Sequence, residues 1–130
     1  MQDTKFDGLM LKNLMEAGHT WLKTNHQTVN ALNVFPVPDG DTGTNMLLTM
    51  NSAIAEVNAS GQNGAGAVAA AFAQGALMGA RGNSGVILSQ VLRGMVATLR
   101  AVGGGVAGAS DVAAALKAAS AASYEAVLKP

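Results

Sequence analysis

The stretch "NVFPVPDGDTGTNM" (Asn33–Met46) contains two of the three prolines in the chain and its most closely spaced pair of acidic residues. Pro36 and Pro38 cannot lie inside a helix, because proline has no N–H to donate and its ring clashes with the preceding turn. The segments on both sides have helical spacing, so the stretch predicts a stiff loop between two helices. Asp39 and Asp41 stand one residue apart in this loop, and their proximity requires an explanation.

Two neighbouring carboxylates repel each other unless a cation lies close to them. Their oxygen atoms select Mg²⁺ or Ca²⁺. A calcium loop of the EF-hand type is excluded, because Thr44 and Met50 occupy the positions where that loop needs Gly and Glu, counting from Asp39. We therefore favour Mg²⁺, with water and phosphate oxygens as its other ligands. The alternative is ordinary turn chemistry, in which Asp41 or Thr42 caps the next helix.

Hydrophobic spacing outside the loop predicts an all-α protein of five or six helices in a single domain, residues 1–130. The first helix is expected from Asp7 to about Asn25, followed by a short helical turn over residues 26–32. Its core stripe is expected to contain Met10, Leu14, Ala17 and Trp21. The other helices are expected at about Thr44–Asn58, Ala65–Met78, Gly85–Val102 and Asp111–Leu128, the last with Ser110 as its N-cap.

Composition excludes several classes of function. Eight basic and eight acidic residues cancel, which gives no electrostatic basis for binding nucleic acid. The absence of cysteine excludes disulfides and thiolate metal sites, and it fits a cytoplasmic protein. The Ala- and Gly-rich run 64–80 is interrupted by Gln74 and is shorter than the roughly 20 apolar residues that a membrane span needs. We expect it to form a buried helix.

A second glycine-rich segment, "GARGNSG" (79–85), also precedes a helix. Helix N-termini carry unpaired N–H groups and suit anions such as phosphate, and glycine lets a phosphate approach the backbone. The segment is neither a P-loop nor a dinucleotide-binding fingerprint, because the required lysine and glycine spacing are absent. Arg81 is interpreted equally well as a phosphate contact or as a solvated charge. Candidate polar donors in the two loops are Thr42, Thr44, Asn45, Asn83 and Ser84.

The longer stretches "LNVFPVPDGDTGTNM" and "GARGNSGVILSQVLRG" resemble the ATP-binding L-subunit family of dihydroxyacetone kinases. Within that family the chain is most similar to the branch that forms the N-terminal domain of bacterial fatty acid kinase. The resemblance covers essentially the whole chain. It implies an antiparallel α-helical bundle or barrel whose open end holds Mg²⁺ and ATP. Because domains of the family continue further, it also implies a partial domain, incomplete at its C-terminal end.

The resemblance assigns roles to residues of both loops. Asp39 and Asp41 would be the catalytic carboxylates and Mg²⁺ ligands, and Asn33 is the nearest polar residue to the place of a third ligand. Thr42, Thr44 and Asn45 would face phosphate, while Asn83, Ser84 and Gly85 would contact the β- or γ-phosphate.

The implied reaction is phosphoryl transfer from ATP to a fatty acid presented by a separate acyl-carrying protein. A fatty acid carboxylate is already ionised at neutral pH and needs no general base. Two alternatives remain open: a phosphotransferase like the dihydroxyacetone kinase L-subunit, working with a dihydroxyacetone-binding subunit, and a non-catalytic helical module that binds nucleotide or a partner. The oligomeric state is also open, with a homodimer as one form.

Overall fold

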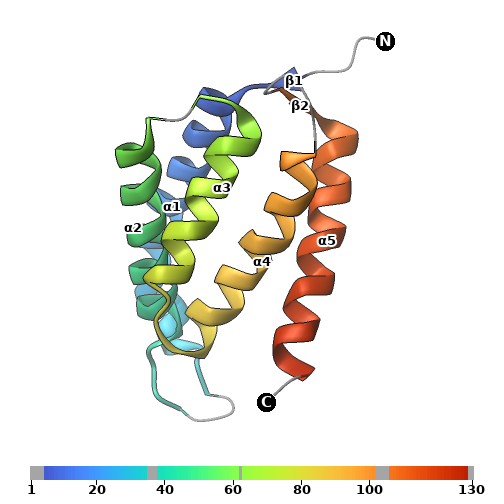
Figure 1. Ribbon diagram of the computed structural model, residues 1–130. Helices are drawn as coiled ribbons and strands as arrows, with labels where there is room; N and C mark the ends of the chain where they lie inside the picture. Colours follow the sequence, from blue (N-terminus) through green and yellow to red (C-terminus); the bar gives the residue numbers. More distant parts are fainter. Residues whose placement is uncertain (1–4, 35–37, 62, 102–105, 129–130) are drawn as a thin grey trace.

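The computed structural model describes residues 5–34, 38–61, 63–101 and 106–128. In these ranges the elements are β1 (Lys5–Phe6), α1 (Gly8–Ala31), α2 (Thr42–Ser60), α3 (Ala65–Met78), α4 (Gly82–Arg100), β2 (Ala107–Gly108) and α5 (Ala109–Leu128). Successive helices run in opposite directions (Figure 1). The N-terminal ends of α2 and α4 therefore lie at the same end of the bundle, here called the loop end. The prediction of an all-α antiparallel bundle is confirmed.

Most helix bounds lie within about two residues of the predicted ones, and three features of the prediction differ more clearly. The two segments predicted before the loop form one continuous helix, α1, because residues 26–31 contain no helix-breaking residue. Its N-cap is Asp7, whose Oδ1 accepts the N–H of Met10 at 3.0 Å. Helix α4 begins at Gly82, three residues earlier than predicted. Ser110 is not an N-cap, because α5 already begins at Ala109.

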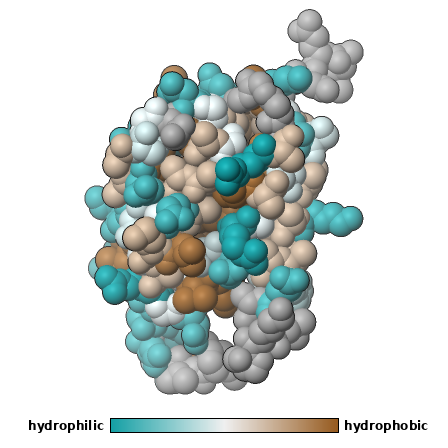
Figure 2. All heavy atoms as spheres, viewed as in Figure 1, coloured by the Kyte–Doolittle hydropathy of each residue, from teal (hydrophilic) through white to brown (hydrophobic). Residues whose placement is uncertain are grey.

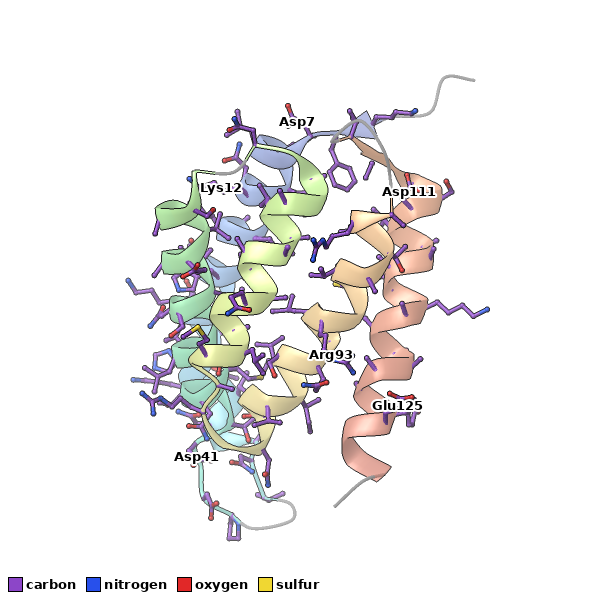
Figure 3. The ribbon with its side chains drawn as sticks, viewed as in Figure 1. Asp7, Lys12, Asp41, Arg93, Asp111 and Glu125 are labelled. Carbon is purple, nitrogen blue, oxygen red and sulfur yellow. The ribbon has the colours of Figure 1, made fainter. Side chains whose placement is uncertain are left out.

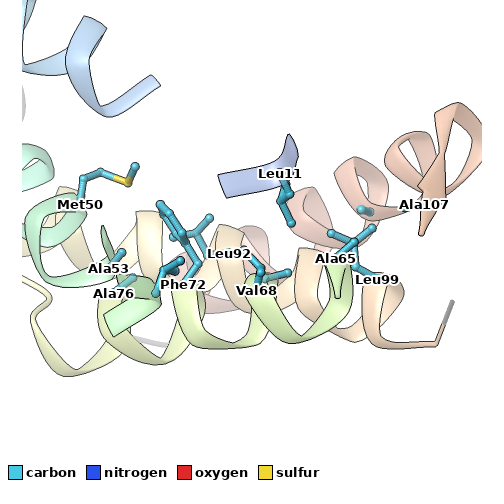
Figure 4. Close-up of a cluster of buried hydrophobic side chains, with 13 residues drawn as sticks. Leu11, Met50, Ala53, Ala65, Val68, Phe72, Ala76, Leu92, Leu99 and Ala107 are labelled. Carbon is cyan, nitrogen blue, oxygen red and sulfur yellow. The ribbon is translucent and has the colours of Figure 1, made fainter. Parts of the chain in front are cut away.

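The core lies between the helices and is built largely from alanine and a few larger side chains (Figure 4). Phe72 and Val68 of α3 are fully buried at its centre. Helix α4 packs against α3 and α5, and α2 packs against α1, α3 and α4. Close packing of α4 on α5 requires glycine at position 94, where an added Cβ would lie 2.5 Å from the carbonyl oxygen of Ala118.

The predicted core stripe of α1 is wrong. Leu14 and Trp21 are 56% and 71% exposed, and Met10 is also exposed. The side of α1 that faces the bundle contains Leu11, which is buried, with Met15 and Leu22 packed against the core. Both sets of residues have helical spacing, so the pattern identified the helix correctly but not its buried face.

A short antiparallel sheet lies at the end of the bundle opposite the loop end (Figure 1). It pairs Lys5 with Gly108 and Phe6 with Ala107. These strands are too short to show an alternating pattern in the sequence, so they were not expected. The Oδ2 atom of Asp111 accepts the N–H of Gly108 at 2.8 Å and fixes the start of α5 beside them.

Figure 2 shows the face over α3, α4 and α5, on which hydrophilic side chains lie among apolar ones. A groove of about 170 Å³ follows α3 and α4 there, with Ala70 and Ala73 as apolar lining and Arg93 and Arg100 as charged lining.

None of the helices in the described ranges is both long and apolar enough to cross a membrane.

Candidate functional site

Two asparagines at and just after the C-terminal end of α1 hold the start of α2. Asn33 Oδ1 accepts hydrogen bonds from the N–H groups of Asp41 (3.1 Å) and Thr42 (3.2 Å). Asn30 Oδ1 accepts the N–H of Thr44 (3.0 Å), and Asn30 Nδ2 donates to Thr44 Oγ1 (2.8 Å). The first N–H groups of a helix have no acceptor within it. The asparagines supply these acceptors and fix where α2 begins.

This capping leaves the aspartate side chains available. Asp41 is the N-cap residue of α2, yet its side chain makes no capping hydrogen bond. Asp39 and Asp41 are both exposed, and Figure 3 shows Asp41 at the loop end. The alternative in which the Asp41 side chain caps α2 is therefore wrong.

The turn between α3 and α4 places the second glycine-rich segment against α2. Arg81 is the N-cap residue of α4, and its N–H donates to Thr49 Oγ1 at 3.2 Å. Ser84 Oγ donates to the carbonyl oxygen of Thr42 at 3.3 Å. These bonds join residues that are 32 and 42 positions apart in the sequence. The two loop motifs thus meet at the loop end.

Two glycines make this close contact sterically possible. A Cβ at Gly82 would collide with the side-chain amide of Asn45, and one at Gly85 would collide with Thr49 Oγ1. Gly82 also has a φ of +66°, a conformation that glycine adopts without steric cost. Helix packing therefore accounts for glycine at position 85, and the contact of Gly85 with phosphate stays a prediction.

The first turn of α4 presents hydrogen-bond donors. The Arg81 side chain makes no capping bond. The N–H of Gly85 donates to the Arg81 carbonyl oxygen at 3.1 Å, which is the first hydrogen bond along the helix. The N–H groups of Gly82, Asn83 and Ser84 come before it. Such groups have no acceptor in their own helix and lie at the positive end of its dipole. The start of α4 consequently suits an anion, whereas three amides at the start of α2 are bonded by the asparagines.

The side chains at the loop end suit a hard cation whose remaining ligands are water and phosphate oxygens. Within the described residues, no three His, Cys, Asp or Glu side chains are grouped to hold a metal. Asp39 and Asp41 offer two carboxylates, the number that Mg²⁺ commonly takes from a protein while water and phosphate fill its other positions. Asn33 directs Oδ1 to two backbone amides, and its role as a metal ligand stays a prediction. Residues 35–37 of this loop, including Pro36, lie outside the described residues.

Sequence reasoning missed two residues that build this site. Asn30 left a weak signal, a second asparagine one helical turn before Asn33. Thr49 gave almost no signal in the sequence, since a hydroxyl residue within a helix is common.

A groove of about 470 Å³ opens between α2 and α3, and Ser52, Glu56 and Arg81 are among its lining residues.

Comparison with known proteins identifies the family of the chain. The sequence pattern of the DAK2 domain matches residues 36–130. The chain belongs to the DAK2 domain family. DAK2 domains are associated with kinase subunits, and the family works with partner subunits. The matched range includes both glycine-containing motifs of this DAK2 domain, except residues 33–35 of the first.

Full-length relatives of the DAK2 domain are much longer than this chain. Protein YloV of Bacillus subtilis is 47% identical over 127 residues, which cover 95% of this chain and 22% of that protein. An uncharacterized protein of Staphylococcus haemolyticus is 41% identical over 127 residues, covering 98% of this chain and 23% of its own length. An uncharacterized protein of Staphylococcus aureus strain USA300 is 50% identical over 91 residues, which cover 70% of this chain and 17% of that protein. The chain spans about a fifth of the length of these relatives.

Proposed function

We propose that this DAK2 domain binds Mg²⁺ and ATP at the loop end and belongs to a kinase that phosphorylates a fatty acid presented by an acyl-carrying protein. One observation carries the proposal. The donors at the start of α4 lie at the same end of the bundle as Asp41, whose side chain makes no capping bond, and hydrogen bonds to Thr49 and from Ser84 join α4 to α2 there.

The two helix starts would have different tasks. At α4, the N–H groups of Gly82, Asn83 and Ser84 would bind phosphate oxygens, with the Asn83 side chain as a further donor. The Ser84 hydroxyl already donates its proton to the carbonyl oxygen of Thr42. At α2, Asp39 and Asp41 would hold Mg²⁺. When bound, Mg²⁺ neutralises negative charge on the transferred phosphoryl group and its neighbour. Thr42 and Asn45 would support both tasks, because they contact Ser84 and Gly82 respectively.

The chemistry of the loop end favours a carboxylate as phosphoryl acceptor. The polar side chains of the two loop motifs that the structure describes are carboxylates, amides, hydroxyls and the Arg81 guanidinium. His26, the nearest histidine in the sequence, has Nδ1 2.8 Å from the Lys23 carbonyl oxygen of its own helix. A hydroxyl acceptor needs a general base to remove its proton, whereas a carboxylate is already ionised at neutral pH. The fatty acid is therefore preferred to dihydroxyacetone. The acceptor and its carrier are proposals for the whole protein, of which relatives are far longer.

The acceptor assay uses the protein at its full natural length. ADP release is measured with Mg²⁺, ATP and an acyl-carrying protein loaded with a fatty acid, and acyl phosphate is trapped with hydroxylamine. Parallel reactions contain dihydroxyacetone with a dihydroxyacetone-binding subunit, or no acceptor. We expect ADP and hydroxamate only in the fatty acid reaction. ADP release only with dihydroxyacetone, or in neither reaction, would contradict the proposal.

A further inference from the structure

Thr49 has an unusual position among the polar residues of the chain. Thr49 and Ser89 are the buried polar residues of the described part, with exposures of 0% and 2%. Ser89 Oγ donates to the carbonyl oxygen of Val86, 2.6 Å away in the same helix. Thr49 Oγ1 instead makes one bond within α2, to the carbonyl oxygen of Asn45 at 2.8 Å, and one across to α4, from the N–H of Arg81 at 3.2 Å.

The bond from Arg81 fixes where α4 starts. Arg81 is the N-cap residue, so the bond holds the backbone immediately before the N–H groups of Gly82, Asn83 and Ser84, which have no acceptor within α4. The same hydroxyl faces Gly85, where a Cβ would collide with it. The hydroxyl is therefore enclosed between the two helices and has one donor and one acceptor partner, which uses its donor capacity fully.

We propose that Thr49 is a positioning residue of the loop-end site. Its hydroxyl holds the first turn of α4 at the place where the N–H groups of that turn would bind a phosphate group whose Mg²⁺ is held by the carboxylates before α2. Thr49 does not touch the ligand itself. The part of this inference that concerns ligand binding rests on the proposed function, and the position of α4 does not.

Two variants separate the hydroxyl from the shape of the side chain. Thr49→Val keeps the branched shape and removes the hydroxyl, whereas Thr49→Ser keeps the hydroxyl and removes a methyl group. Ser89→Ala is the matched control, because it also removes a buried hydroxyl but none that crosses between helices. If Thr49→Val does not fold, Gly85→Ala disturbs the same contact from the α4 side.

The first readout is amide hydrogen exchange measured by NMR, which needs no ligand. Loss of the acceptor should speed exchange of the Arg81 N–H in Thr49→Val by about tenfold or more relative to wild type. Thr49→Ser and Ser89→Ala should leave this amide within about threefold of wild type. Unchanged exchange at Arg81 in Thr49→Val, or an equal increase in Ser89→Ala, would overturn the inference.

The second readout is the Kd for ATP in the presence of Mg²⁺. Thr49→Val should raise Kd about tenfold, equivalent to roughly 1.4 kcal/mol, while Thr49→Ser and Ser89→Ala stay within about threefold. Equal Kd values for Thr49→Val and wild type, despite faster exchange at Arg81, would show that the position of α4 does not matter for the ligand and would overturn the positioning role. Absence of binding by wild type would contradict the proposed function instead, and the role toward the ligand with it.

Discussion

Asn30 and Thr44 bond each other twice across the loop between α1 and α2. Asn30 Oδ1 accepts the Thr44 N–H at 3.0 Å, and Asn30 Nδ2 donates to Thr44 Oγ1 at 2.8 Å. The Thr44 hydroxyl therefore already accepts one hydrogen bond inside the protein. It retains its own proton to donate, so the predicted contact of Thr44 with phosphate is compatible with this pair and is tested separately from it.

Replacing Asn30 with alanine should destabilise the fold. The change removes both bonds and leaves the partly buried N–H of Thr44 without its acceptor, so we expect the free energy of unfolding to fall by about 1–3 kcal/mol. Urea denaturation measures this. Asn25→Ala is the control, since the Asn25 side chain donates to the Trp21 carbonyl oxygen in its own helix, and its loss should cost less than about 0.5 kcal/mol. Equal losses in the two variants would contradict the linking role of Asn30.

Variants of Asn33 distinguish a capping oxygen from a metal ligand. Asn33→Ala removes the acceptor of the Asp41 and Thr42 amides, and unfolding free energy should fall by about 1–3 kcal/mol. Asn33→Asp keeps an acceptor oxygen and should remain closer to wild type. Denaturation without metal gives both values. An alanine variant as stable as wild type would leave the metal-ligand role as the better account of Asn33.

Trp21 should behave as a surface residue although its spacing resembles a core position. It is the single tryptophan of the chain and is 71% exposed, so its fluorescence should be emitted at long wavelength and quenched readily by acrylamide. Trp21→Gln should change the unfolding free energy by no more than about 0.5 kcal/mol. By contrast, Phe72→Ala in the core should cost about 3–5 kcal/mol. Blue-shifted emission that resists quenching would show that Trp21 is covered in solution.

Local sequence patterns predict this bundle well where one face of a helix is clearly apolar. The clearest case is α4, in which Leu92 and Leu99 are both buried, whereas the bounds of α3, Ala65–Met78, follow from the glycine-rich turns on both sides of it. In α1 the pattern fails, because Leu11 and Leu14 belong to two different apolar stripes of similar quality. Only the packing of α1 on α2 and α3 selects the side with Leu11.

The candidate site was predictable as two motifs but not as a connected structure. Proline, glycine and paired aspartates mark the loops through their effects on the nearby backbone. The bonds from Asn30 to Thr44 and from Arg81 to Thr49 connect positions 14 and 32 residues apart. Spacing along the chain carries no information about such pairs until the helices are placed next to each other.

The central claim is that Asp39 and Asp41 hold a cation and do not stabilise the fold. Asp39→Asn and Asp41→Asn each remove one of two like charges, and neither change removes a cap bond of the Asp41 side chain, which makes none. We expect the melting temperature without ligand to stay unchanged or rise slightly. Asp7→Asn is the matched control at the opposite end of the bundle, since asparagine caps a helix as well as aspartate does.

Calorimetric titration of ATP in the presence of Mg²⁺ is the most direct test. We expect wild type to bind, with much weaker binding of Mg²⁺ when ATP is absent, because two carboxylates alone make an incomplete site. Asp39→Asn and Asp41→Asn should weaken ATP binding by about tenfold or more, and Asp7→Asn should match wild type within about twofold. Wild-type affinity in both carboxylate variants, accompanied by a lower melting temperature, would contradict the cation site and return both aspartates to a structural role.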